Sequence, residues 1–151
     1  MQREPSPVTG WRFIIWAVAV WGAGGLVFFR QFVFSGFDRV FGNLGDGRLV
    51  VYLHEHLYQV VQGLAPLTSP AMLYPKSGIL GYSDAFLLDV LLYAPLRLLG
   101  CDPFLSYQLT WVVLSLIGFV SFTALLVRFA GVRMSVALVG SALFVFPNML
   151  M

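Results

Sequence analysis

Long apolar runs alternate with polar segments along this chain, and their lengths predict helices that cross a membrane. Residues 13–29, "FIIWAVAVWGAGGLVFF", carry no charge, and with their flanking aromatic residues they reach about the 20 residues that a crossing helix needs. Residues 104–127 form a second uncharged run, and residues 134–151 form a third. A secretory signal peptide is the alternative for the first run, but no clear small-residue cleavage site follows it.

We therefore predict an all-α integral membrane protein with three transmembrane helices. The expected segments are 1–12 (N-terminal segment), 13–33 (first span), 34–102 (large loop), 103–127 (second span), 128–133 (short loop) and 134–151 (third span, cut short). The last run stops without polar flanking residues, so we expect the chain to be the N-terminal part of a longer protein or a truncated copy of one.

The large loop contains a second kind of pattern, which predicts an amphipathic helix on the membrane surface or on other helices. Apolar residues recur there at helical spacing, at Leu49, Leu53, Leu57, Val60 and Leu64. Most polar residues of this stretch fall off that stripe: Arg48, Glu55, Gln59 and Gln62. The next stretch, "LTSPAMLYPKSGILGYSD", is rich in proline, glycine and serine, and this composition is typical of a structured loop.

Residues 85–95 are apolar except for Asp89, and we interpret them as a re-entrant or interfacial helix that Pro95 and Gly100 end. If residues 84–99 crossed the membrane instead, a central Asp89 would cost about 2.5–3.5 kcal/mol. Asp102 and Pro103 then form a helix start, with Asp102 as N-cap and Pro103 as the first helical residue.

Basic residues near the spans predict the orientation. Arg3 and Arg12 precede the first span, and Arg128 and Arg133 lie between the second and third, so both segments should be cytoplasmic. Residues 34–102 should then lie outside, and they hold six of the seven acidic residues. We expect an inner (plasma) membrane protein of bacterial type.

Composition supports the membrane class and excludes others. The chain is 59% hydrophobic, 11% charged and has a mean hydropathy of +0.84, whereas soluble domains carry about 25% charged residues. A net charge of +2 without a basic cluster excludes nucleic acid as a partner. Cys101 is the single cysteine, which excludes an intrachain disulfide and a cysteine-rich metal site.

The triplet His54-Glu55-His56 raises the question of a metal site. Residues two apart on a helix point to different faces, and the zinc-binding HExxH pattern needs histidines four apart. We therefore expect a solvated helix face and predict no metal site, with Glu55 as a candidate second acid.

Two aspartates each allow two interpretations. Asp46 precedes the amphipathic helix, so it is either an N-cap or a functional carboxylate, and the two roles are compatible. Asp84 in "GYSD" precedes an apolar helix, so it either caps that helix or faces the same cavity as Asp46. Lys76, after Pro75, lies in an expected turn.

An acidic motif just after the first span, followed by a peripheral helix and a proline-rich stretch, resembles the N-terminal part of GT-C fold membrane glycosyltransferases. Relatives often carry Asp-Glu there, with an Arg and a Tyr a few residues on. Here "DGRLVVY" supplies Asp46, Arg48 and Tyr52, with Gly47 where many relatives have Glu. The later stretch is "YPKSGILGYSDAF".

The resemblance implies transfer of a sugar from a polyprenyl-phosphate donor to an acceptor at the outer face, with inversion. A carboxylate should activate the acceptor hydroxyl, and cationic groups should bind the phosphate. The catalytic candidates are Asp46, Glu55 and Asp84, and the substrate-binding candidates are Arg48, Lys76, Tyr52 and Tyr82. The resemblance identifies no certain cofactor, and Asp46 could also bind a divalent cation.

A non-catalytic polytopic membrane protein, such as a scaffold or a flippase-like or transporter-like subunit, is the alternative. It would share this topology, and Gly47 in place of a second acid favours it. Expected partners under either hypothesis are the lipid bilayer and the rest of the protein or other membrane subunits, and the enzyme would add the lipid-linked sugar donor.

Overall fold

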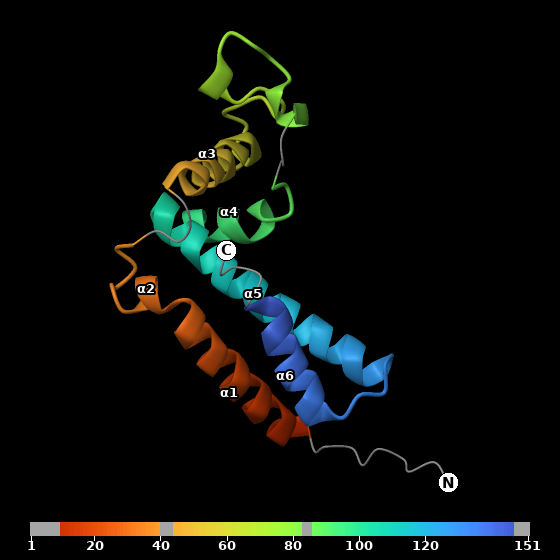
Figure 1. The fold of residues 1–151 in the computed structure, drawn as a ribbon. Coiled ribbons are helices and arrows are strands. Elements are labelled where there is room, and N and C mark those ends of the chain that lie inside the picture. Colours follow the sequence, from red (N-terminus) through yellow and green to blue (C-terminus); the bar gives the residue numbers. More distant parts are fainter. Residues whose placement is uncertain (1–9, 40–43, 83–85, 147–151) are drawn as a thin grey trace. The chain divides into compact units, whose positions relative to one another are not determined.

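The computed structural model describes residues 10–39, 44–82 and 86–146 (Figure 1). Every regular element in these ranges is helical, which confirms the all-α prediction. The elements are α1 (Gly10–Phe28), α2 (Arg30–Val33), α3 (Leu44–Val61), η1 (Ala71–Leu73), η2 (Ile79–Tyr82), α4 (Val90–Leu98), α5 (Pro103–Arg128) and α6 (Met134–Val145). They form two compact units: Met1–Arg30 with Leu114–Met151, and Gln31–Val113.

Helix α5 is the one helix, within the described ranges, that is long and apolar enough to cross a membrane. Its 26 residues extend about 39 Å at 1.5 Å per residue, which exceeds the hydrocarbon core of about 30 Å. It coincides with the predicted second span. The other two apolar helices, Ile14–Phe28 and Met134–Val145, are shorter, so the first and third spans stay predictions.

The start of α5 has the cap that its sequence predicts. The Asp102 carboxylate accepts hydrogen bonds from the backbone N–H groups of Phe104 (2.9 Å) and Leu105 (3.1 Å). Pro103 occupies the first helical position, where its missing N–H costs no hydrogen bond. Asp102 thus satisfies backbone donors that the first turn of a helix otherwise leaves unpaired.

Replacing Asp102 with Ala should lower the free energy of unfolding by about 1 kcal/mol, because it removes this cap. Asp102→Asn is the matched control, since Asn caps helices about as well as Asp. Thermal unfolding of the detergent-solubilised variants measures the difference. Equal stability of the Ala and Asn variants would contradict the capping role.

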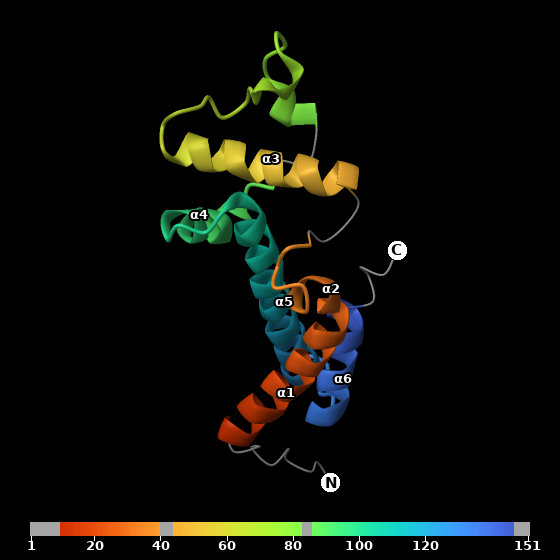
Figure 2. The same ribbon diagram turned by 90° about the vertical axis from the view of Figure 1, so that its left-hand side faces the viewer.

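The first unit packs α1, α6 and the second half of α5 through small and polar residues, as Figure 2 shows for the helices. The Trp21 indole N–H donates to Ser115 Oγ at 3.2 Å, and Thr123 Oγ1 donates to Ser141 Oγ at 2.8 Å. A Cβ on Gly24 would lie 2.4 Å from the Phe146 ring, so glycine permits this approach. Polar contacts and small residues of this kind hold helices together in lipid.

The second unit packs α3 against α4 and against the first turns of α5. Its core contains Val51, Tyr58, Tyr93, Ala94 and Tyr107, and a smaller cluster holds Leu53, Leu57 and Leu80. Only the middle of the predicted apolar stripe is therefore buried. Leu49 is partly exposed, and Leu64 lies past the end of α3 at Val61 and is exposed.

The helix predicted over residues 85–95 begins and ends later than expected. Helix α4 starts at Val90 and continues through Pro95 to Leu98, so the predicted break at Pro95 is wrong. Proline removes one backbone donor, which the short helix tolerates. The predicted stop at Gly100 is correct: its φ is +92°, and the Cys101 N–H bonds the Leu96 carbonyl, a glycine-type helix end.

Candidate functional site

Helix α3 carries most of the predicted site residues, but on two faces. Arg48, Tyr52, Glu55 and Gln59 are spaced by three or four residues and form one stripe along the helix. Asp46 lies about 180° away from Glu55 at 100° per residue, and it is exposed. The structure therefore separates the leading acid from the other candidates on the same helix.

Asp46 is not the N-cap that we considered for it. It is the third residue of α3, which begins at Leu44. A carboxylate in the first turn is stabilised by the positive end of the helix dipole. Within the described residues, Asp46 forms no ion pair and no side-chain hydrogen bond, so its carboxylate oxygens face solvent.

Glu55, in contrast, is held by α4. Its carboxylate accepts two hydrogen bonds from Arg97, from Nε at 2.9 Å and from Nη2 at 3.1 Å. The Tyr93 hydroxyl donates a third, at 2.8 Å. Arg97 also donates to the Cys101 carbonyl, and its Cζ lies 5.4 Å from the centre of the Tyr58 ring. We call Glu55, Tyr93 and Arg97 the α3–α4 clamp.

The clamp determines the protonation of its members. Burial alone would raise the pKa of Glu55, but the hydrogen bonds from Arg97 and Tyr93 outweigh burial and lower it. Burial, together with the bond to Glu55, raises the pKa of Tyr93, so its hydroxyl stays a donor. A carboxylate stabilised in this way is a weak base. The catalytic role of Glu55 stays a prediction, and its contacts favour a structural role.

His54 and His56 do not form the solvated face that we expected, because both are buried. His54 lies 3.4 Å from the Asp89 carboxylate and stacks on Tyr93, with ring centres 5.1 Å apart. His56 points elsewhere, with Nε2 3.4 Å from the Leu67 carbonyl. The two histidines do face different sides of α3, but Asp89 beside α4 covers one side and the loop after α3 covers the other.

Burial lowers the pKa of His54 and outweighs the opposite effect of Asp89. The unfolded chain should therefore take up a proton near pH 6.5 that the folded chain takes up only at lower pH. This contribution to stability is complete above pH 6.5 and decreases as the pH falls below it. The wild type should thus lose thermal stability as the pH falls below about 6.5.

The variant His54→Gln tests this pH dependence. It should unfold at a temperature that depends less on pH than that of the wild type. Thermal unfolding scans of the solubilised protein at several pH values supply the measurement. An unchanged slope in His54→Gln would contradict the assignment to His54.

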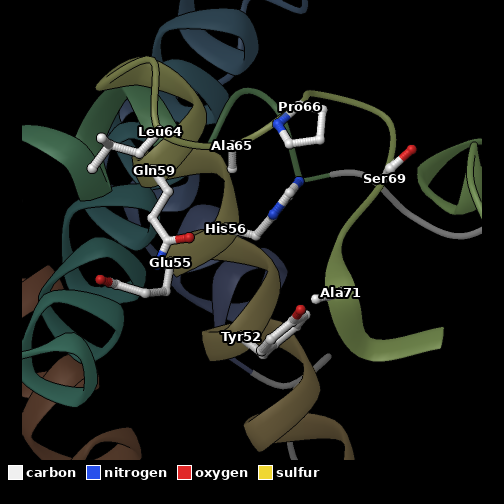
Figure 3. A pocket seen from close by; sticks show the side chains of 9 residues that line it. All are labelled: Tyr52, Glu55, His56, Gln59, Leu64, Ala65, Pro66, Ser69 and Ala71. Carbon is white, nitrogen blue, oxygen red and sulfur yellow. The ribbon is translucent and has the colours of Figure 1, made fainter. Parts of the chain in front are cut away.

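A small open cavity lies between α3 and the loop that follows it (Figure 3). Tyr52 and His56 project towards this loop, whereas Glu55 turns away from it (Figure 3). The cavity is about 180 Å³, smaller than the roughly 300–1,000 Å³ typical of ligand pockets. Its lining is mixed: Tyr52, Glu55, His56, Gln59, Leu64, Ala65, Pro66, Ser69 and Ala71. It cannot hold a whole lipid-linked sugar.

Of the remaining candidates, the structure describes the side chain of Lys76, which does not line this cavity. Lys76 is exposed in the loop between η1 and η2. Tyr82 ends η2, but its side chain lies outside the described residues, as does all of Asp84. Nowhere in residues 10–39, 44–82 and 86–146 do three His, Cys, Asp or Glu side chains gather to hold a metal ion.

The sequence identified the candidate residues on α3 but not the residues on α4 that bind them. Arg97 and Tyr93 lie one turn apart on α4, and a lone arginine in an apolar helix is itself a signal that an acid must pair with it. The sequence alone did not identify that acid, because Glu55 lies 42 positions away.

Comparison with protein-family models, curated proteins and solved structures finds no match to the chain.

Proposed function

We propose that this chain is the N-terminal, membrane-embedded part of a GT-C-like glycosyltransferase. It would transfer a sugar from a polyprenyl-phosphate donor to an acceptor at the outer face of the membrane. The support is the resemblance of "DGRLVVY" and its surroundings to that family, together with an α5 that is long enough to cross a bilayer. In this proposal the N-terminus is cytoplasmic and residues 34–102 lie outside.

One observation carries the choice of Asp46 as leading acid: its carboxylate is exposed and unengaged by the described residues, whereas the Glu55 carboxylate is bound by Arg97 and Tyr93. A general base must reach the acceptor hydroxyl and be able to take up its proton. Arg48, exposed two residues later, would bind phosphate oxygens of the donor. Asp46 could instead position a divalent cation.

Sugar transfer by the protein itself tests this proposal. Membranes from cells that overproduce the protein would be given a panel of polyprenyl-phosphate hexoses with a radiolabelled sugar. We expect label to leave the lipid fraction faster than in membranes without the protein. Loss of this transfer after chelation by EDTA would assign the cation role. Identical donor consumption in both membranes, for every hexose of the panel, would refute the activity.

The non-catalytic alternative also has an observation in its favour. Asp46 lies about 180° from Glu55 and about 120° from Tyr52 around α3, so these residues do not converge on one reacting atom. A scaffold or transporter-like subunit needs no such convergence. In that case donor lipids would remain intact while the protein still co-purifies with other membrane subunits.

A further inference from the structure

Helix α4 has an apolar face that the described part of the protein leaves uncovered. Leu91 and Leu98 are 69% and 70% exposed, and Pro95 lies between them on the same stripe. The flanking leucines at positions 87, 88 and 99 are exposed as well. At 100° per residue, the three helical positions Leu91, Pro95 and Leu98 fall within an arc of about 60° along α4. Such a stripe is the mark of an amphipathic helix with one apolar side.

The opposite face of α4 is occupied by protein. Tyr93, about 160° from Leu91 at 100° per residue, is buried in the core of the second unit. Arg97 is fixed on that side by its two hydrogen bonds to Glu55. The α3–α4 clamp therefore fixes the rotation of α4 about its own axis, so that the leucine stripe points away from α3.

The chain holds α4 close to the start of α5. Four residues separate Leu98 from Pro103, which allows a gap of at most about 17 Å. Tyr107, in the second turn of α5, packs in the same core as Tyr93. Since we propose that α5 crosses the membrane, α4 must lie beside the membrane surface at which α5 begins.

The length and charges of α4 favour a position in the plane of that surface. Nine residues extend about 14 Å, less than half of a hydrocarbon core of about 30 Å. Asp89 precedes the helix and Arg97 lies in its last turn, and both bind polar partners on α3. Entry into the bilayer would carry these ionised groups away from water, whereas a surface position leaves them at the polar boundary.

We propose that α4 is an interfacial helix, with the leucine stripe Leu91, Leu98 and their exposed neighbours inserted among lipid acyl chains on the side where α5 begins. The inference rests on the proposed crossing by α5 and is independent of any sugar transfer. It decides between the interfacial and re-entrant alternatives that the sequence leaves open.

Site-specific fluorescence in vesicles tests the insertion. Cys101, the single cysteine, is replaced by Ser, and one cysteine at a time is introduced as Leu98→Cys, Ile117→Cys or Lys76→Cys. Each variant of the protein is labelled with the polarity-sensitive probe NBD and reconstituted into phosphatidylcholine–phosphatidylglycerol vesicles. Lipids brominated near the headgroup or near the chain end then act as shallow and deep quenchers. All three sites are exposed, so the label should not disturb packing.

The Leu98 probe should show blue-shifted emission and lose more fluorescence to the shallow quencher than to the deep one. The Ile117 probe, near the middle of α5, should be quenched best by the deep lipid, and the Lys76 probe should be quenched by neither. Quenching at Ile117 without quenching at Leu98 would overturn the inference. Stronger deep than shallow quenching at Leu98 would overturn it too, in favour of a re-entrant helix. Absence of quenching at Ile117 would instead refute the crossing by α5.

Discussion

Replacing Asp46 with Asn should abolish sugar transfer while leaving expression and stability unchanged. Asn keeps the size of Asp, and the exposed Asp46 side chain forms no hydrogen bond within the described residues that the change would remove, but Asn cannot take a proton from the acceptor hydroxyl. Loss of a general base typically lowers the rate about 10²–10⁴-fold. The radiolabel transfer assay in membranes measures the effect, with the amount of protein checked by immunoblot.

Asp38→Asn is the matched control for this prediction. Asp38 is also an exposed aspartate near the start of the second unit, and it belongs to no proposed site. It should transfer sugar at the wild-type rate. If Asp46→Asn keeps full activity, the catalytic assignment is wrong, and equal losses in both variants would point to charge in this segment rather than to a base.

Breaking the α3–α4 clamp should give the largest loss of stability. Glu55→Gln or Arg97→Met leaves the other charge half-buried and without its partner, at an expected cost of about 1–3 kcal/mol in the free energy of unfolding. The lower part of this range applies because both side chains keep some exposure, and solvent weakens such pairs. The double variant should lose less than the sum of the two single variants. Unfolding by titration with SDS in mixed micelles measures all three.

The same variants separate a structural from a catalytic role of Glu55. If the clamp is structural, Glu55→Gln and Arg97→Met should reduce stability and sugar transfer in parallel. If Glu55 is a catalytic acid, Glu55→Gln should abolish transfer while Arg97→Met retains part of it. Arg133→Met, at an exposed arginine just before α6, is the control and should match the wild type in both measurements. Additive losses in the double variant would contradict the pairing.

The contribution of the α3–α4 clamp to the free energy of unfolding should also depend on pH. Because the pKa of Glu55 is lowered in the folded protein, its contribution is present above the unfolded value of 4.5. That contribution is lost as the pH falls through the lowered pKa, when the carboxylate is protonated. The His54 effect appears at higher pH, so the two can be told apart in one pH series.

Local signals in the sequence determined much of the helical framework. The uncharged run 104–127 became α5, and the pair Asp102-Pro103 became its cap, because a helix start depends only on residues within one turn. Gly100 ended α4 for an equally local reason, its positive φ. The proline at position 95 misled the prediction, because α4 continues through it while Tyr93 and Ala94 pack in the core of the second unit.

What only the tertiary structure decided is which polar groups meet. Glu55 lies 42 positions from Arg97, and His54 lies 35 positions from Asp89, so no pattern within one helix could pair them. Because of these pairs, the triplet that we predicted to be solvated contains two buried histidines and a carboxylate bound by the α3–α4 clamp. Asp46 remains exposed on the other face of α3. Hydrophobic periodicity and capping act along the chain, whereas burial and ion pairing depend on which helices fold against each other.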